Sequence, residues 1–191
     1  MKKILALSCL LLTLVTTRSA EASTFSLTSL DVSLRDKDPG LVLSLSNAWT
    51  GSFSLNSADP TETIKLFTIG TKETALNLDD LVPYDIKVGL GFSSPSTFHG
   101  SVTGATGALW LGQSFGYVLW NDPVQLAFGP GNSGLLQVAL SNVAFGLPGT
   151  ANVYATFTLL KEAQYSTPEP GTLALLGIGA VVAAMRRRAR R

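Results

Sequence analysis

Few side chains in this chain could carry catalysis. His99 is the only histidine, so a Ser-His-Asp relay would depend on it, and the residues around it do not form a nucleophile elbow. A glycosidase needs two carboxylates that face each other across a cleft, and the sequence does not place residues such as Glu62 and Asp122 opposite each other. We therefore expect no catalytic residue and a protein that is not an enzyme. An extracellular hydrolase is the weakest alternative.

Acidic residues could instead bind calcium through their carboxylate oxygens. Asp36 and Asp38 form one such group, and Asp79, Asp80 and Asp85 form another. The first group precedes Pro-Gly, which is typical of a turn, and neither group belongs to a twelve-residue calcium loop with its terminal Glu. We expect no metal site and no cofactor, and structural calcium stays open as the alternative.

Aromatic side chains offer a different chemistry, because their flat rings can pack on the apolar faces of sugars. Trp110, Tyr117 and Trp120, together with Trp49, could form a sugar-binding face. Large rings in strands also commonly fill a core. A carbohydrate-binding module is therefore the alternative function.

Two glycine-rich segments do not predict a phosphate site. Residues 104–107 and 129–134 lack the Lys and the following helix that a phosphate-binding loop requires. We interpret both segments as β-turns.

The central segment, residues 23–166, is long enough for one domain with its own core. It contains six Lys and Arg residues against eleven Asp and Glu residues, a net charge of −5. An acidic surface does not favour nucleic acid as a partner.

Alternating apolar residues predict strands throughout this segment. In residues 25–34 the alternation slips at Thr28-Ser29, which predicts a β-bulge. Residues 108–112 and 115–120 look like two arms of a hairpin, and 76–81 could form one short helical turn. The spacing of about ten residues, with Gly, Pro, Asn and Asp between segments, predicts an all-β sandwich or jelly roll. The other expected strands are residues 41–45, 52–56, 63–69, 85–92, 101–103, 124–128, 135–141 and 152–160.

The N-terminus has the layout of a secretory signal peptide. Two lysines precede the apolar run 4–15, and Ala20 and Ala22 supply small residues before a cut ahead of Ser23. We expect export through the translocon and removal of residues 1–22, as a helix, by signal peptidase. The single cysteine, Cys9, would leave with this segment, so the mature protein would have no thiol.

The C-terminus combines a rigid motif, an apolar segment and a basic cluster. Pro168, Glu169 and Pro170 precede residues 171–185, which lack charge and would span roughly 22 Å as a helix. This span is short for a bilayer, but arginine side chains can reach into the headgroup layer and lengthen it. We predict a single transmembrane helix with the body outside and the basic cluster in the cytoplasm; a buried C-terminal helix is the alternative. The cluster comprises Arg186, Arg187, Arg188, Arg190 and Arg191.

Residues 167–191 resemble the PEP-CTERM sorting domain of Gram-negative bacterial proteins in their order of motif, apolar helix and basic tail. The resemblance implies recognition by exosortase, a membrane enzyme that removes the tail near Pro-Glu-Pro and releases or transfers the protein. Proteins with this tail are typically associated with extracellular polysaccharide and the biofilm matrix.

These observations predict three parts: a signal peptide at 1–22, a β-sandwich domain at 23–166 and a sorting signal at 167–191. We expect an exported protein that is held briefly in the cytoplasmic membrane and then reaches the cell surface or the extracellular matrix. Its expected partners are signal peptidase, the translocon, exosortase, the membrane and exopolysaccharide, without nucleic acid. Its expected role is structural.

Overall fold

The structure, a computed structural model, describes residues 22–34, 40–165 and 177–178. This part of the chain is all-β, with eleven strands and two single-turn 3-10 helices, η1 (Asp79–Leu81) and η2 (Pro130–Asn132). The strands are β1 (Ser23–Ser33), β2 (Ser44–Ser46), β3 (Gly51–Leu55), β4 (Thr61–Thr71), β5 (Tyr84–Ser94), β6 (Phe98–Trp110), β7 (Ser114–Trp120), β8 (Val124–Phe128), β9 (Gly134–Leu140), β10 (Val143–Gly146) and β11 (Gly149–Lys161).

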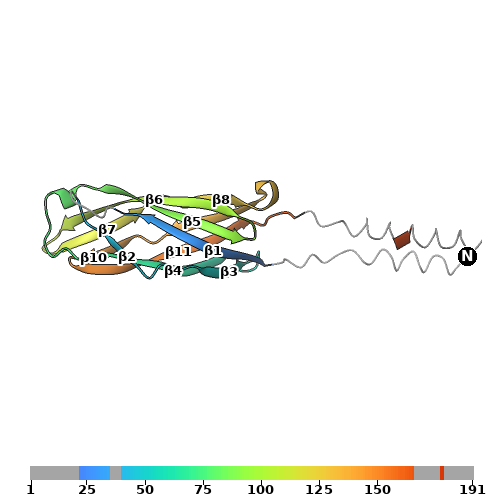
Figure 1. Cartoon of the computed structure of the whole chain (residues 1–191), viewed down its shortest axis with the longest axis horizontal. Helices are drawn as coiled ribbons and strands as arrows, with labels where there is room; N and C mark the ends of the chain where they lie inside the picture. Colours follow the sequence, from blue (N-terminus) through green and yellow to red (C-terminus); the bar gives the residue numbers. More distant parts are fainter. Residues whose placement is uncertain (1–21, 35–39, 166–176, 179–191) are drawn as a thin grey trace, which may run out of the picture.

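The strands form two sheets that lie face to face (Figure 1). The first sheet has the order β10-β7-β6-β5-β1-β3, and the second has the order β2-β4-β11-β9-β8. All paired neighbours run antiparallel. The strand that opens the body, β1, and the strand that closes it, β11, both have their outer termini at the same end of the body (Figure 1). We call this the exit end, and the opposite end the distal end.

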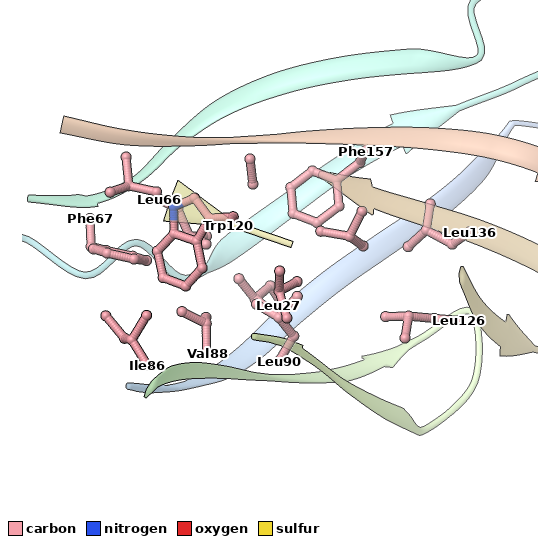
Figure 2. Close-up of a cluster of buried hydrophobic side chains, with 14 of the residues drawn as sticks. Leu27, Leu66, Phe67, Ile86, Val88, Leu90, Trp120, Leu126, Leu136 and Phe157 are labelled. Carbon is pink, nitrogen blue, oxygen red and sulfur yellow. The ribbon is translucent and has the colours of Figure 1, made fainter. Parts of the chain in front are cut away.

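The core lies between the sheets, where the inward residues of every long strand meet (Figure 2). Phe53 of β3 stacks on Phe157 of β11 with ring centroids 4.5 Å apart, and Phe25 of β1 meets Phe128 of β8 edge to face at 5.1 Å. Each pair joins one sheet to the other. Burying a side chain of this size contributes about 1.5–3 kcal/mol, so these pairs help to fix how the two layers face each other.

The all-β prediction is confirmed, and so are three local features. The pairing of β1 with β5 is interrupted between Leu27 and Ser29, which leaves Thr28 as the extra residue of a bulge. Residues 108–110 pair with 114–116 in a hairpin. The short turn expected within residues 76–81 is η1.

The interpretation of residues 104–107 as a turn is wrong. Gly104, Ala105, Thr106 and Gly107 continue β6, which joins two segments that we expected as separate strands. The glycines are accommodated because aromatic rings lie over them. A Cβ on Gly104 would lie 2.9 Å from Cε3 of Trp120, and one on Gly107 would lie 2.8 Å from the hydroxyl of Tyr117.

Two other strands differ from expectation. β10 was not predicted, because four residues followed by Leu147-Pro148 give little alternation to detect. The strand expected at 41–45 is reduced to β2, although Leu41 and Leu43 are buried in the core at 1% and 4% exposure. The second glycine-rich segment, 129–134, does form the turn between β8 and β9.

The two expected terminal helices lie mostly outside the described residues. Asp36 and Asp38 also lie outside them. Gly177 and Ile178 are described, and both have helical backbone geometry. Within the described parts of the chain, no helix is long and apolar enough to cross a membrane.

Candidate functional site

The β6–β7 hairpin positions three of the four aromatic residues expected to bind sugar; the fourth, Trp49, lies between β2 and β3, partly buried against the core. Its register pairs Trp110 with Ser114, Gly107 with Tyr117 and Gly104 with Trp120. Because side chains alternate between the two faces of a strand, Tyr117 and Trp120 lie on opposite faces of the sheet. The structure therefore does not bring the three rings onto one surface.

Trp120 is a core residue, 8% exposed. Its ring meets Phe67 of the opposite sheet edge to face, with centroids 6.4 Å apart, and lies among Leu66, Val88 and Ile86 (Figure 2). A sugar has no access to a ring in this position.

Tyr117 is half-buried on the outer face of the first sheet. Its ring lies close over the backbone of Gly107, so part of the ring is covered by the sheet. Leu109 and Leu119 are each half exposed and, by the alternation of the strands, share this outer face with Tyr117.

Trp110 is the ring that remains accessible. It ends β6 at the hairpin tip and is 68% exposed, and the adjacent Leu111 is 75% exposed. Gly112, with φ of 79°, makes the turn at this tip. The helix η1 contacts β6, and its loop adds Leu78, Leu81 and Val82 to the exposed apolar residues of this part of the body. We call the exposed apolar residues of the η1 loop and the hairpin tip the distal cap: Leu78, Leu81, Val82, Leu109, Trp110 and Leu111.

Two of the acidic residues considered for calcium, Asp79 and Asp80, accept hydrogen bonds from backbone amides. Asp79 accepts a hydrogen bond from the Gly40 amide at 2.7 Å, and Asp80 accepts one from the Asn77 amide at 2.7 Å. Glu73 likewise accepts one from the Val42 amide at 3.1 Å. Asp85 is exposed on β5. Among the described residues, no group of three or more His, Cys, Asp and Glu side chains could hold a metal ion.

His99 lies on the outer face of the first sheet, exposed to solvent, beside residues that the sequence did not single out. Ser29 of β1 and His99 of β6 flank Gly91 of β5 in one row. A side chain on Gly91 would collide with the Ser29 hydroxyl and lie 3.0 Å from Nδ1 of His99. The sequence did contain a signal for this site. Two alternate glycines, Gly89 and Gly91, within an expected strand indicate a stretch of backbone that no side chain of its own covers. Across the residues that the structure covers, no hydrogen bond joins Ser29 to His99, and the neighbouring Thr28 hydroxyl donates one to the Gly91 carbonyl at 3.2 Å.

The chain leaves the body through a short segment, Ala163–Tyr165, that we call the strap. The Cβ of Ala163 lies 2.5 Å from where a Cβ on Gly129 would be, which is possible because Gly129 has none. The Gln164 amide donates a hydrogen bond to Oγ of Ser133 at 2.9 Å, and the Tyr165 hydroxyl donates one to the Pro95 carbonyl at 3.4 Å. These contacts fix the strap on two turns of the exit end.

Comparison with known proteins identifies the segment that follows the strap. A family model described as the PEP-CTERM protein-sorting motif matches residues 166–191. The searches of curated proteins and of solved structures give no match for this chain. The chain is therefore a PEP-CTERM sorting-domain-containing protein, whose motif marks it for sorting by exosortase to the cell surface or the extracellular space.

Proposed function

We propose that this protein is a non-enzymatic structural component of the exopolysaccharide matrix, delivered by a temporary membrane tether. In this proposal signal peptidase cuts ahead of Ser23. The apolar segment 173–185 then holds the precursor in the bilayer, with the arginine cluster left in the cytoplasm, until exosortase cuts near Pro168-Glu169-Pro170.

One observation carries this proposal: the sorting motif at 166–191 begins directly after a folded β body. The position of β1 agrees with it, since the first strand residue, Ser23, pairs with Leu55 and is the residue that signal peptidase would leave at the new N-terminus. Removal of both terminal segments would thus spare every described strand.

The test is the processing of the full-length precursor in cells that contain the cognate exosortase. Replacing Pro168, Glu169 and Pro170 by alanines should leave a membrane-held precursor, whereas the unchanged chain should yield a product whose C-terminal mass shows loss of the tail. A motif variant that matures to the same mass as the unchanged chain would refute the proposal. Mass spectrometry of both termini reads out each cut separately.

A second candidate is polysaccharide binding through the distal cap. The observation that favours it is the 68% exposure of Trp110, an aromatic ring at the β6–β7 tip of the distal end. Contiguous exposed apolar patches on a soluble protein often mark interaction sites. The exposed ring would face the matrix while the exit end faces the membrane.

Binding of the secreted product to purified exopolysaccharide separates the two roles. In the binding model, Trp110→Ala removes the interaction, while Leu160→Ala does not, because Leu160 is also exposed (44%) but lies near the exit end on β11. Equal retention of both variants and the unchanged chain would exclude the distal cap as the binding surface. If the unchanged chain is not retained on the polysaccharide, only the structural role remains.

A further inference from the structure

The turns at the exit end are short and carry small side chains. Three turns meet there: residues 56–60 between β3 and β4, 95–97 between β5 and β6, and 129–133 between β8 and β9. The pairings of Ser23 with Leu55, Ser26 with Ser94 and Lys161 with Leu135 bring all three beside the start of β1 or the end of β11. Asp59 is the one charged residue in these turns, and the exposed residues there include Ser57, Ala58, Thr97 and Asn132.

The strap limits how far the sorting motif can stand from this surface. Only Ser166 and Thr167 separate Tyr165, which contacts the Pro95 carbonyl, from Pro168. An extended chain advances at most about 3.6 Å per residue, so Pro168 lies within about 11 Å of Tyr165 as long as the strap stays in place. An enzyme that encloses Pro168-Glu169-Pro170 must therefore come within this distance of the folded body.

We infer that the exit end is the surface of the body that contacts exosortase while the sorting motif lies in the enzyme's active site. This inference rests on the proposed function. Small side chains let two protein backbones approach closely, and the near absence of charge in the three turns lowers the cost of removing water from them. The charged residues nearest to these turns are Asp59 itself, Glu62 at the start of β4, and Lys161 and Glu162 at the end of β11.

The test has two parts. Arginine substitutions first add bulk and charge to this surface, and a flexible insertion then lengthens the chain between the body and the sorting motif. In the full-length precursor, the double variant Ser57→Arg and Thr97→Arg changes two exposed turn residues whose side chains are not needed by the core. We expect about a tenfold slower conversion of precursor to product, typical of a misplaced charge in a protein contact. The matched control is Gln113→Arg, which adds the same side chain to the exposed hairpin tip at the distal end and should not change the rate.

A flexible insertion distinguishes loss of contact from any other defect. About eight Gly and Ser residues inserted between Tyr165 and Ser166 extend the reach by roughly 15 Å, so the enzyme no longer needs to touch the turns. The insertion should restore the rate of the double variant to that of the unchanged chain.

Two outcomes would overturn the inference: processing of the double variant at the unchanged rate, or slow processing that the insertion does not correct. Either outcome leaves the proposed function standing provided that the alanine variant of Pro168-Glu169-Pro170 stays unprocessed. If that alanine variant matures normally, the proposed function itself fails, so the two failures are distinguishable.

Discussion

Trp120 meets Phe67 edge to face, with ring centroids 6.4 Å apart and ring planes at 81°, although the two residues belong to different sheets. The same strand presents Tyr117 on its other face. One hairpin therefore supplies both a ring of the core and a ring of the surface, and a substitution in it acts on stability or on recognition according to which face it changes.

Replacing Trp120 should test the core assignment. Trp120→Ala removes the largest ring of the contact with Phe67 and should lower the free energy of unfolding by about 3–5 kcal/mol. Trp120→Phe should cost much less, because it keeps a ring and removes an indole N–H that meets no acceptor among the described residues. Chemical denaturation of the secreted product measures both values.

Trp110→Ala is the matched control for this series, since that ring is exposed and its loss should change stability by no more than about 0.5 kcal/mol. A large loss of stability in the Trp110 variant, with a small one in the Trp120→Ala variant, would reverse the two assignments.

The continuation of β6 through Gly104 makes a second prediction. A Cβ on this residue would lie 2.5 Å from the carbonyl oxygen of Leu119, which is backbone and cannot rotate away. Gly104→Ala should therefore destabilise the protein by about 1–3 kcal/mol, measured as a lower thermal midpoint. Gly146→Ala is the control, because the nearest atom to its Cβ position is 4.0 Å away. Equal midpoints for the two variants would contradict the packing of β6 against β7.

The third prediction concerns Asp79 and tests whether its carboxylate stabilises the fold by accepting a backbone hydrogen bond or by binding a metal ion. Asp79→Ala removes the acceptor for the Gly40 amide and should cost about 1–2 kcal/mol, whereas Asp79→Asn keeps an acceptor oxygen and should cost less. Asp85→Ala, at an exposed position on β5, should be nearly neutral. The free energy of unfolding is measured in urea, with and without calcium, for each variant. If calcium stabilises the unchanged chain and Asp79→Ala abolishes that stabilisation, the loop binds the ion.

The basic cluster should determine on which side of the membrane the tail ends. Replacing Arg186, Arg187, Arg188, Arg190 and Arg191 by serines removes charges that cost about 2.5–3.5 kcal/mol each to place in the bilayer centre. In cells without exosortase, the C-terminus of this variant should become accessible to external protease, whereas a variant with lysines should stay protected. Protection of the serine variant would rule out the cluster as the cytoplasmic stop.

Local sequence patterns predicted much of the fold. The bulge at Thr28 follows from a slip in apolar alternation, and β8 has the bounds that its alternation predicted. Both features depend on residues adjacent in the chain, because the two faces of a strand alternate with period two. The turn expected at Gly104–Gly107 failed for the opposite reason: glycine favours turns when considered alone, but here Trp120 and Tyr117 from the next strand cover the two glycines and stabilise an extended backbone.

The candidate sites also divide into one that local sequence predicts and others that depend on the tertiary structure. A sorting motif is a linear signal, so the order of Pro168-Glu169-Pro170, apolar segment and arginines was enough to recognise it without any fold. The sequence by itself also determined the β class, through alternation within each strand. Only the tertiary structure decided that Trp120 is buried while Trp110 is exposed, and that the strap is held by Ser133 and Pro95, more than thirty residues away. These outcomes depend on which strands become neighbours, and that pairing is set by the packing of the whole core, which no local pattern contains.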